Sequence, residues 1–357
     1  MKKYYLLFVA MIALFVISCE SSTPDIDDDN NDKAEHSLLI LHEGVMNNNT
    51  ASLAKYDIES EKLTIDYFNE ISKRGLGDTA SDMIKYGGKV YISVSKSNTV
   101  EVIDIHTGEV TQINNISQEP NKMVAHGGKV YLSSYDDTVT RIDTISLQKE
   151  ATITVGRDPE GLCVWDGKLY VANSGALDFI NNNHDNTISV IDIETFKEEK
   201  KIEVGKNPFQ LYPDSKGNIY FSTRAVYDGI DWINPKYPAS LCVIDAKSNE
   251  VNTIEGIVPS KFVLANNIAY IVIEDYDKEI VTAYDCMSGE VIKDNILPAD
   301  FKMTTPYHIS IGSESNNLYL TETDYTTPGN VHAFDKDGVH KYSVKATGIN
   351  PTVVIEY

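Results

Sequence analysis

Apolar and polar residues alternate along this chain in a short pattern that occurs several times. Its clearest copies are 87–93 (GGKVYIS), 127–133 (GGKVYLS) and 166–172 (DGKLYVA). Each copy is followed, after a polar gap, by a second apolar run that ends in Asp, as in 102–104 (VID). Gly-Gly or Asp-Gly between two such runs is typical of a tight hairpin turn, because these residues accept positive φ. The pattern therefore predicts antiparallel strands, and their β-branched and aromatic residues suit a half-buried sheet.

Two recurring residues count the repeated units. A Tyr in the second strand recurs at Tyr91, Tyr131, Tyr170, Tyr220, Tyr270 and Tyr319. An Asp that closes the third strand recurs at Asp57, Asp104, Asp143, Asp192, Asp245, Asp285 and Asp335. A period in the forties of residues, with four strands per unit, is typical of a β-propeller blade.

The two counts differ by one because the chain starts inside a blade. Residues 38–41 (LLIL) occupy the place of a second strand, and no first strand precedes them. The chain ends in 351–357 (PTVVIEY), which is similar to the inner-strand openings 120–124 (PNKMV), 159–163 (PEGLC) and 306–309 (PYHI). We therefore expect an all-β, seven-bladed β-propeller whose ring is closed by the C-terminal strand joining the first blade. Closure of this kind removes exposed sheet edges.

The first 35 residues differ from the repeats. Lys2 and Lys3 precede an apolar run over 4–17, which is shorter than the roughly 20 residues of a membrane span and suits a signal peptide. The run ends in 16–19 (VISC), which resembles a bacterial lipobox. We expect 1–18 to be a lipoprotein signal peptide and Cys19 to carry lipid, the alternative being an ordinary signal peptide with a chance Cys. Residues 19–35 are polar, acidic and aperiodic, which predicts a disordered tether before a propeller over 36–357.

Composition, cysteine positions and the absence of catalytic motifs argue against several classes of function. The chain has 357 residues, a net charge of −22 and a pI near 4.7, which argues against a nucleic-acid partner because phosphates need a basic surface. Cys163 and Cys242 lie in apolar strand runs and Cys286 at a turn, so we expect structural cysteines and no disulfide framework. The sequence holds no nucleophile elbow, P-loop or HExxH motif.

The candidate site lies in the loops of one face. In a propeller, loops that join second to third strands share a face with loops that join successive blades, here called the upper face. These loops are long in blade four (175–186) and blade five (224–239), and long loops in a compact repeat are usually functional. The ligand-binding residues that we predict are Phe179, Asn181, Asn182, Asn183, Arg224, Tyr227, Trp232, Tyr237, Tyr276, Tyr325 and His308. The alternative is that these aromatic residues pack on one another and hold the long loops.

An enzyme is the second hypothesis. Glu43, Glu274 and Glu322 are expected on the upper face, where carboxylates around a propeller axis can bind a cation, as in propeller lactonases and lyases. By residue type His184 and His308 would suit acid–base chemistry, although a His among asparagines, such as His184, is more often a surface group. We predict no catalytic residue, no metal and no cofactor.

The run 87–109 (GGKVYISVSKSNTVEVIDIHTGE) resembles the YncE-like, or surface-layer-protein, β-propeller repeat, and the resemblance extends over roughly 38–357. With its lipoprotein start, the chain looks like the surface propeller lipoproteins of Bacteroidetes, the BtuG-type vitamin B12-binding proteins among them. The resemblance implies an outer-membrane, lipid-anchored, surface-exposed protein. It also implies that a cobamide, or another bulky small molecule, is bound as a ligand and handed to a TonB-dependent outer-membrane transporter. It supplies no site residue, and a scaffold that binds another surface protein stays open as a third possibility.

Overall fold

The computed structural model describes residues 37–357 apart from 182, 228, 230, 232 and 276–277; at 179–181, 274–275 and 278–279 it describes the backbone only. Several expectations therefore lie outside the described residues. They are the signal peptide 1–18, the tether 19–35 with the lipidated Cys19, the residues Asn182, Trp232 and Tyr276, and the side chains of Phe179, Asn181 and Glu274.

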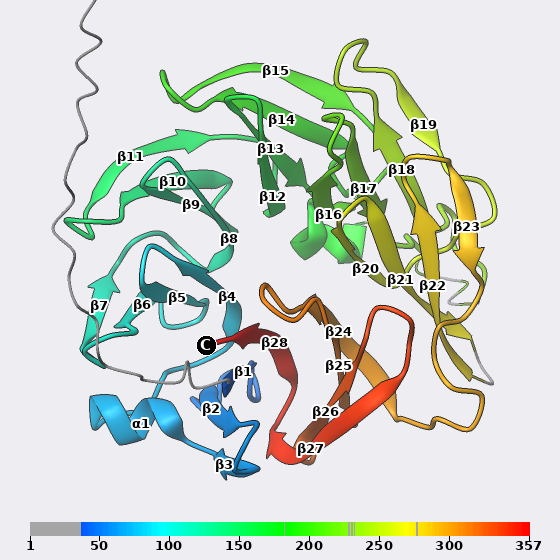
Figure 1. Ribbon diagram of the computed structural model, residues 1–357. Coiled ribbons are helices and arrows are strands. Elements are labelled where there is room, and N and C mark those ends of the chain that lie inside the picture. Colours follow the sequence, from blue (N-terminus) through cyan, green and yellow to red (C-terminus); the bar gives the residue numbers. More distant parts are fainter. Residues whose placement is uncertain (1–36, 182, 228, 230, 232, 276–277) are drawn as a thin grey trace, which may run out of the picture. The chain divides into compact units, whose positions relative to one another are not determined.

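The described chain forms seven four-stranded antiparallel sheets arranged as the blades of a ring (Figure 1), which confirms the predicted β-propeller. From inside to outside, blade one holds β28 (Pro351–Glu356), β1 (Ser37–His42), β2 (Ser52–Asp57) and β3 (Lys62–Thr64); blade two holds β4 (Ala80–Tyr86), β5 (Lys89–Val94), β6 (Thr99–Asp104) and β7 (Val110–Asn114). Blade three holds β8 (Pro120–His126), β9 (Lys129–Ser134), β10 (Thr138–Asp143) and β11 (Lys149–Thr154); blade four holds β12 (Pro159–Trp165), β13 (Lys168–Asn173), β14 (Thr187–Asp192) and β15 (Lys197–Glu203). Blade five holds β16 (Pro208–Pro213), β17 (Ile219–Thr223), β18 (Ser240–Ile244) and β19 (Val251–Thr253). Blade six holds β20 (Lys261–Ala265), β21 (Ile268–Asp275), β22 (Lys278–Asp285) and β23 (Glu290–Lys293); blade seven holds β24 (Thr305–Ile311), β25 (Leu318–Thr323), β26 (Gly329–Phe334) and β27 (His340–Gly348).

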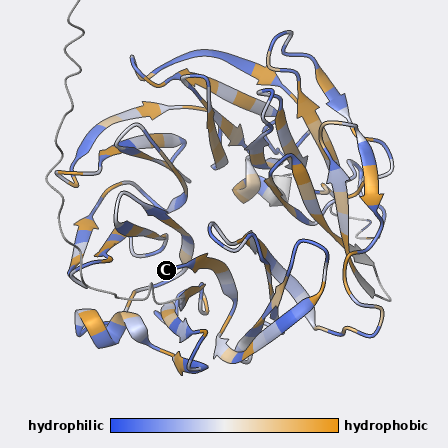
Figure 2. Ribbon diagram, in the orientation of Figure 1, coloured by the Kyte–Doolittle hydropathy of each residue, from blue (hydrophilic) through white to orange (hydrophobic). Residues whose placement is uncertain are grey.

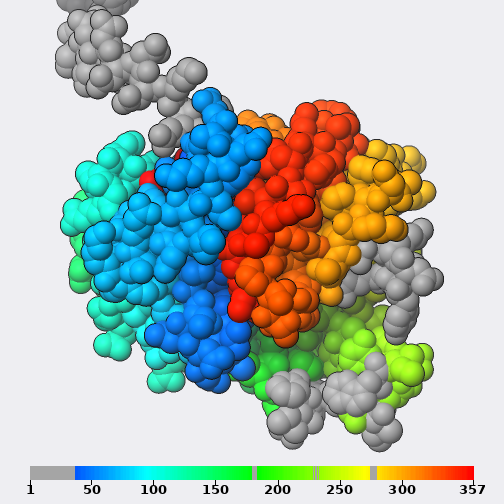
Figure 3. All heavy atoms as spheres, turned by 90° about the horizontal axis from the view of Figure 1, so that it is seen from below, coloured from blue at the N-terminus to red at the C-terminus, as the bar shows by residue number. Residues whose placement is uncertain are grey.

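The C-terminal strand closes the ring as predicted. β28 pairs antiparallel with β1, with Leu39 opposite Ile355. Figure 3 shows the two ends of the described chain, blue and red, packed against each other. The carboxylate of Glu356 also reaches blade seven, where it accepts hydrogen bonds from the Tyr319 hydroxyl at 2.9 Å and the Glu314 amide at 2.7 Å. The last strand is thus fixed to the blades on both sides of the closure.

The recurring Asp residues each begin a turn on the lower face. Oδ1 of Asp104 accepts hydrogen bonds from the backbone amides of His106 and Thr107, both at 3.0 Å. An acceptor at this position satisfies amides that a tight turn leaves unpaired. The same turn recurs where third strands end at Asp143, Asp192, Asp245, Asp285 and Asp335, and the Asp57 side chain accepts from the Ser60 amide. These residues are repeated because every blade needs the same turn.

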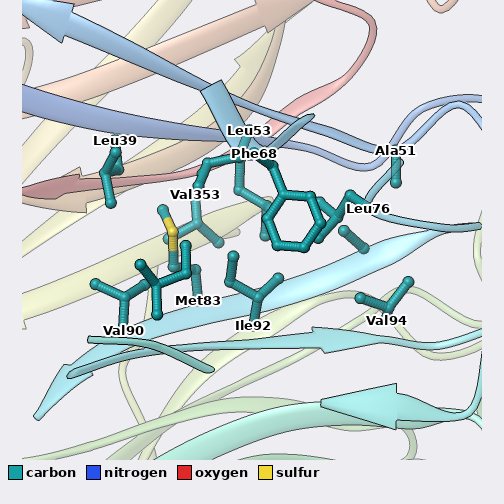
Figure 4. Close-up of a cluster of buried hydrophobic side chains, with 13 residues drawn as sticks. Leu39, Ala51, Leu53, Phe68, Leu76, Met83, Val90, Ile92, Val94 and Val353 are labelled. Atoms are coloured by element: carbon teal, nitrogen blue, oxygen red, sulfur yellow. The ribbon is translucent and has the colours of Figure 1, made fainter. Parts of the chain in front are cut away.

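The hydrophobic core lies between neighbouring blades. The six recurring Tyr residues are buried there. Figure 2 shows apolar residues along strands of the blades, the outer strand β23 included. Figure 4 shows the cluster between blades one and two, in which Leu39, Met83 and Val353 pack near Phe68. Phe68 belongs to the short helix α1 (Tyr67–Ser72). No helix in the described part of the chain is long and apolar enough to cross a membrane.

The three described cysteines are structural, as the sequence indicates. Cys163, Cys242 and Cys286 are buried and free. Burial raises the pKa of each thiol, that of Cys286 to about 12. A thiol with a raised pKa carries little reactive thiolate at neutral pH.

Candidate ligand-binding site at the mouth of the ring

The inner strands of all seven blades open with the same four-residue pattern. A Pro, replaced by Ala in blade two, is followed by two variable residues and then by a buried apolar residue. The copies are 80–83 (ASDM), 120–123 (PNKM), 159–162 (PEGL), 208–211 (PFQL), 259–262 (PSKF), 306–309 (PYHI) and 351–354 (PTVV). The second-residue ring is Ser81, Asn121, Glu160, Phe209, Ser260, Tyr307 and Thr352, and the third-residue ring is Asp82, Lys122, Gly161, Gln210, Lys261, His308 and Val353.

A β-bulge lies at this opening in most blades. The pairing register shifts between Pro120 and Met123, and at the same place in blades two, four, five and seven. In five blades the preceding residue has a positive φ: Thr79, Glu119, Asp158, Asn207 and Asn350, with φ from 44° at Asp158 to 59° at Thr79. A bulge re-aims the side chains of a strand. Two consecutive residues of one strand therefore line the same space, where regular alternation would place only one.

That space is a cavity of about 580 Å³ on the upper face. Pairs of consecutive ring residues line it, for example Asn121 with Lys122 and Tyr307 with His308. Upper-face loops add further lining, including Leu177 from blade four. The volume falls within the range of small-molecule sites, which is roughly 300–1,000 Å³.

Arg224 builds one wall of the cavity. It follows β17, and its guanidinium donates two hydrogen bonds to the carboxylate of Glu160, at 2.6 and 2.8 Å. The same guanidinium lies 3.5 Å from the centre of the Phe209 ring. Glu160 is only 2% exposed, so its charge depends on this paired geometry. The wall is therefore a stacked, ion-paired unit that joins blades four and five.

Asn121 and Tyr135 lie beside this wall, and both line the cavity. Asn121 is 4% exposed, and its backbone carbonyl accepts a hydrogen bond from Oγ of Ser93 at 2.5 Å. Burial raises the pKa of the Tyr135 hydroxyl, and the side-chain amide of Asn121, which hydrogen-bonds to it, acts in the opposite direction.

The third-residue ring carries most of the charge deeper in the cavity. Nζ of Lys122 donates to the backbone carbonyl of Ser81 at 2.6 Å. The neighbouring Asp82 accepts a hydrogen bond from the Met123 amide at 2.8 Å. Burial raises the pKa of the Asp82 carboxyl, while the charge of Lys122 opposes that rise.

His308 of the same ring stays neutral. Burial lowers its pKa to about 3, and the positive charges of Lys122 and Lys261 act in the same direction. At neutral pH it therefore offers one N–H donor and one nitrogen acceptor to the cavity. This pKa also sets His308 apart from a general base poised near pH 7.

Exposed apolar side chains stand on the upper-face loops. They are Met46, Leu177, Ile233, Tyr237, Val258 and Tyr325, of which Met46 and Leu177 line the cavity. The Tyr325 ring meets the Tyr307 ring edge-on, with centroids 5.9 Å apart, and the Tyr307 hydroxyl donates to the carboxylate of Glu43. A cavity with a mixed lining and apolar side chains on the surrounding face suits a ligand that has both polar groups and apolar surface.

Some of the predicted site residues lie in or next to the cavity, and others lie elsewhere in the upper-face loops. Arg224 and His308 line the cavity, and Tyr325 contacts a residue that does. Tyr227 is half-buried in the blade-five loop and Tyr237 is exposed there, in a β-bridge with Val226. Asn183 is exposed, and its carbonyl accepts a hydrogen bond from Arg157. Among the described residues of the long loops 175–186 and 224–239, Leu177 and Arg224 line the cavity.

Loop length did not indicate Asn121, Lys122, Glu160 or Lys261, all of which line the cavity. A signal for them was present in the sequence. When the seven inner-strand openings are aligned, these residues occupy the two positions at which the repeat does not agree with itself.

His184 is buried, contrary to the expected surface position. It is 5% exposed, and Nζ of Lys206 donates to its carbonyl at 2.9 Å. The blade-four loop, which contains the 3₁₀ helix η1 (Ala176–Asn181), is fixed by a bond from the Leu177 amide to Asp158 at 3.0 Å. A fixed loop of this kind can bury a His that its asparagine-rich neighbours suggest is exposed.

The described upper-face carboxylates have partners within the protein. Glu43 accepts from Tyr307, and Glu322 accepts from the amide of Thr304 at 2.5 Å and from its hydroxyl at 3.1 Å. Across the described residues, no group of three or more His, Cys, Asp or Glu side chains has the geometry of a metal site.

Comparison with known proteins supports the fold. The PQQ_2 family model, described as "Outer membrane protein assembly factor BamB", matches residues 59–148. A search of curated proteins finds no match to this sequence. The chain is therefore a seven-bladed β-propeller with repeats similar to those of BamB.

Three solved structures are similar to it. Hydrazine synthase of Kuenenia stuttgartiensis is 19% identical, with a TM-score of 0.55 over 70% of this chain and 74% of that chain. The computationally designed Ika8 protein is 13% identical, with a TM-score of 0.56 over 90% of each chain. Apo AztD from Citrobacter koseri is 13% identical, with a TM-score of 0.53 over 90% of this chain and 97% of that chain. Because these identities are low and one of the three proteins is an enzyme by name, the similarities show the fold alone.

Proposed function

We propose that this protein binds a bulky small molecule at the mouth of the ring. The observation that carries the proposal is the 580 Å³ cavity, whose lining differs in chemistry from blade to blade. Bulged inner strands give it a rigid polar wall, and the upper-face loops surround it with exposed apolar side chains. Rigid polar contacts fix orientation, while aromatic and apolar contacts contribute area.

The specific ligand that we propose is a cobamide, bound as a ligand and not used as a cofactor. A corrin is broad and flat, so it would lie across the mouth and rest on the rim residues Tyr325 and Leu177. Its amide groups need donors and acceptors, which Asn121 and Arg224 present at the wall. Contacts to several rigid blades at once would favour slow release.

A binding role is favoured over a cation-dependent enzyme. The carboxylate of Glu160 is paired with Arg224, that of Glu43 accepts a hydrogen bond from the Tyr307 hydroxyl, and that of Glu322 accepts from the backbone amide and the hydroxyl of Thr304. A cation would have to displace these partners before it could use the oxygens. Of these three residues, Glu43 and Glu160 line the cavity, and both are engaged by neighbouring side chains.

The proposal extends to the cellular position. With lipid on Cys19, the protein would be held at the outer membrane with its propeller displayed at the surface, and it would pass the cobamide to a TonB-dependent transporter. A multiply acylated Cys holds a protein firmly, whereas one weak signal does not. We expect Cys19→Ser to move the protein from the membrane fraction to the soluble fraction. A variant that stays with the membrane would contradict the lipoprotein assignment.

Calorimetric titration of the mature protein with cyanocobalamin tests the ligand. We expect one site per chain and micromolar or tighter affinity. Replacing the rim residue Tyr325 by Ala should weaken binding by roughly 1–4 kcal/mol. The matched control is Lys247→Gln in the exposed β18–β19 turn, which should bind as the unchanged protein does. Absence of heat and of co-elution at micromolar concentration would rule out the cobamide.

A further inference from the structure

Aromatic side chains from three blades line the cavity without belonging to the hydrophobic core. Tyr135 follows β9 of blade three, and Phe209 and Tyr307 belong to the second-residue ring in blades five and seven. All three are half-buried, and none is part of the hydrophobic clusters that the described residues form. Tyr212 also lines the cavity, but it packs against two of these clusters. Core packing therefore does not explain the other three rings.

Phe209 is the least expected of the three. The Tyr307 hydroxyl donates to Glu43, and the Tyr135 hydroxyl interacts with the side-chain amide of Asn121, so both tyrosines take part in polar contacts of the wall. Phe209 has no polar group with which to do so. It occupies a position at which the other six blades carry a polar residue. A large apolar ring at this position needs a reason other than the repeat.

Phe209 forms a flat stack with Arg224. The Arg224 guanidinium lies 3.5 Å from the centre of the Phe209 ring, and its two terminal nitrogens donate to Glu160 at 2.6 and 2.8 Å. One face of the guanidinium is thus covered by the ring and its outer edge by the carboxylate. The Arg224 side chain is nevertheless 36% exposed, and both members of the stack line the cavity. The surface that remains for the cavity includes the second flat face of the guanidinium.

The surrounding backbone holds this stack in place. Gly161 follows Glu160, and a Cβ atom at Gly161 would collide with the carbonyl oxygen of Phe209. The glycine therefore lets the strand openings of blades four and five approach each other closely. The backbone amide of Arg224 donates to the carbonyl of Asn207 at 3.0 Å, which fixes the start of the blade-five loop. A platform that is ordered before binding loses little conformational entropy when a ligand arrives.

A flat guanidinium on a flat ring is a surface for a third planar group. Arg stacks on aromatic faces through its delocalised charge and its weak hydration, and the attraction comes from the electron-rich face of the ring. Nucleic-acid-binding proteins use aromatic rings and guanidinium planes in this way to hold single bases.

The charges of the lining favour an uncharged group. Four acidic and four basic side chains line the cavity, so that its formal charge is balanced. Two of the pairs are in direct contact: Lys96 lies 2.6 Å from Glu119, and Arg224 lies 2.6 Å from Glu160. A charged ligand group would lose its hydration without meeting an excess of the opposite charge.

We infer that the Phe209–Arg224 pair is a stacking subsite, which receives an uncharged planar aromatic ring of the ligand inside the cavity. The inference rests on the proposed function and adds the chemical class of the group that enters the ring. In a cobamide that group is the nucleotide base, which projects from one face of the corrin. The corrin would then lie across the mouth with its base side toward the cavity.

The test uses benzimidazole, a planar ring that is uncharged at pH 7, as a probe of the mature protein. Cyclohexanol, which is not planar, is the comparison. The Nε–H NMR signal of Arg224, assigned with an Arg224→Lys variant, reports the subsite. We expect a saturable shift of this signal with millimolar benzimidazole and none with cyclohexanol. No shift with benzimidazole, or equal shifts with both probes, would overturn the inference.

Phe209→Leu keeps an apolar side chain and removes the flat ring, so affinity for benzimidazole should fall about tenfold. Phe209→Tyr keeps the ring and should bind as the unchanged protein does. The matched control is Phe196→Leu, because Phe196 also stacks with an Arg, 4.9 Å from Arg141, outside the cavity. Equal affinities of the two Leu variants would contradict the subsite. Melting temperatures show whether each variant is folded, and the two probes decide on the unchanged protein if Phe209→Leu is not.

Two corrinoids separate this inference from the proposed function. Dicyanocobinamide lacks the nucleotide base, so it should bind about tenfold more weakly than cyanocobalamin, and Phe209→Leu should remove this difference. Equal binding of both corrinoids contradicts the subsite and leaves the proposed function standing. Benzimidazole binding without binding of either corrinoid supports the subsite and rejects the cobamide as the source of the ring.

Discussion

On the lower face of every blade, the turn after the third strand begins with an Asp whose side chain accepts hydrogen bonds from backbone amides of that turn. On the upper face, every inner strand opens on two residues that differ between blades, such as Asn121-Lys122 in one and Phe209-Gln210 in another. Both places belong to the same repeat. The difference teaches that a repeated residue marks what each blade needs to fold. A position whose residue differs from blade to blade, although each blade has the same strands, indicates a residue with a role in binding.

The C-terminal strand β28 closes the ring, so its removal should have the largest effect on the protein. Deleting 349–357 removes β28 and leaves β1 as an open edge in blade one. The Glu356 contacts to blade seven are lost as well. We expect the truncated chain to aggregate. A truncated protein as soluble and heat-stable as the full chain would show that the ring does not depend on its closure.

His42 is an exception to this comparison, because it lies at the upper end of β1 and stabilises the fold. It is fully buried between the hydroxyls of Thr347, at 3.0 Å, and Ser52, at 3.1 Å. Burial lowers its pKa from 6.5 to about 4. Below pH 6.5 the unfolded chain takes up this proton, whereas the folded protein takes it up only near pH 4. The free energy of unfolding should therefore decrease as the pH is lowered from about 6.5 to about 4, by up to about 3 kcal/mol.

Denaturant melts at pH 7, 5.5 and 4.5 measure this loss. His42→Gln should be less stable at pH 7 and should show a smaller loss on acidification. The matched control is His106→Gln, at an exposed lower-face turn, which should keep the pH dependence of the unchanged protein. If stability falls equally with acidification in both variants, other groups cause the pH dependence. His308 is one such group, because burial lowers its pKa as it lowers that of His42.

Replacing Arg224 tests whether a residue of the cavity wall contributes only to ligand binding or also to folding stability. Arg224→Ala leaves the carboxylate of Glu160 buried without its bidentate partner. Loss of one member of a buried pair is strongly destabilising, and partial exposure of Arg224 reduces the effect here to about 2–3 kcal/mol. Cyanocobalamin affinity should fall too.

The double variant Glu160→Gln with Arg224→Gln separates these two effects. It removes the unpaired charge and should recover most of the stability, but not the affinity. Denaturant melts and calorimetry on the same samples measure both. Full recovery of binding in the double variant would contradict a contact between Arg224 and the ligand.

The smallest effect is expected at the lower turns. Asp143→Ala removes the acceptor for the amides of Ile145 and Ser146 and the partner of Lys129. The hydrogen bond from Lys129, followed by those from Ser146, lowers the pKa of the Asp143 carboxyl, so its stabilising effect is present at neutral pH and is lost in acid. Because the turn is solvent-exposed, we expect a drop of only a few degrees in melting temperature at pH 7. Cyanocobalamin binding should not change; a weakened affinity would show that the two faces are coupled.

Local pattern was sufficient to predict the scaffold. The alternation around Tyr91 and Tyr131 and the Asp that ends each third strand gave seven blades, because every blade solves the same packing and turn problem. The strand-like end 351–357 predicted the closure, since one inner strand was missing at the start. Apolar surroundings likewise predicted that Cys163 and Cys242 are buried.

The site was only partly accessible to the same reasoning. Loop length and residue type led to Arg224, His308 and Tyr325, which lie in or next to the cavity. They did not lead to Lys122 and Lys261, which look like ordinary polar residues at the start of a strand. They also placed His184 at the surface, although the folded blade-four loop buries it.

What the sequence by itself determined is the repeated unit, its number and its closure, because these depend on neighbours along the chain and on a pattern present in every copy. Only the tertiary structure decided which residues face the axis. Bulges at the strand openings turn two consecutive side chains inward, and the ring then brings together residues from blades far apart in the chain. The chemistry of the cavity wall exists only in that arrangement, since it depends on which side chains meet there and not on how many of each kind the chain contains.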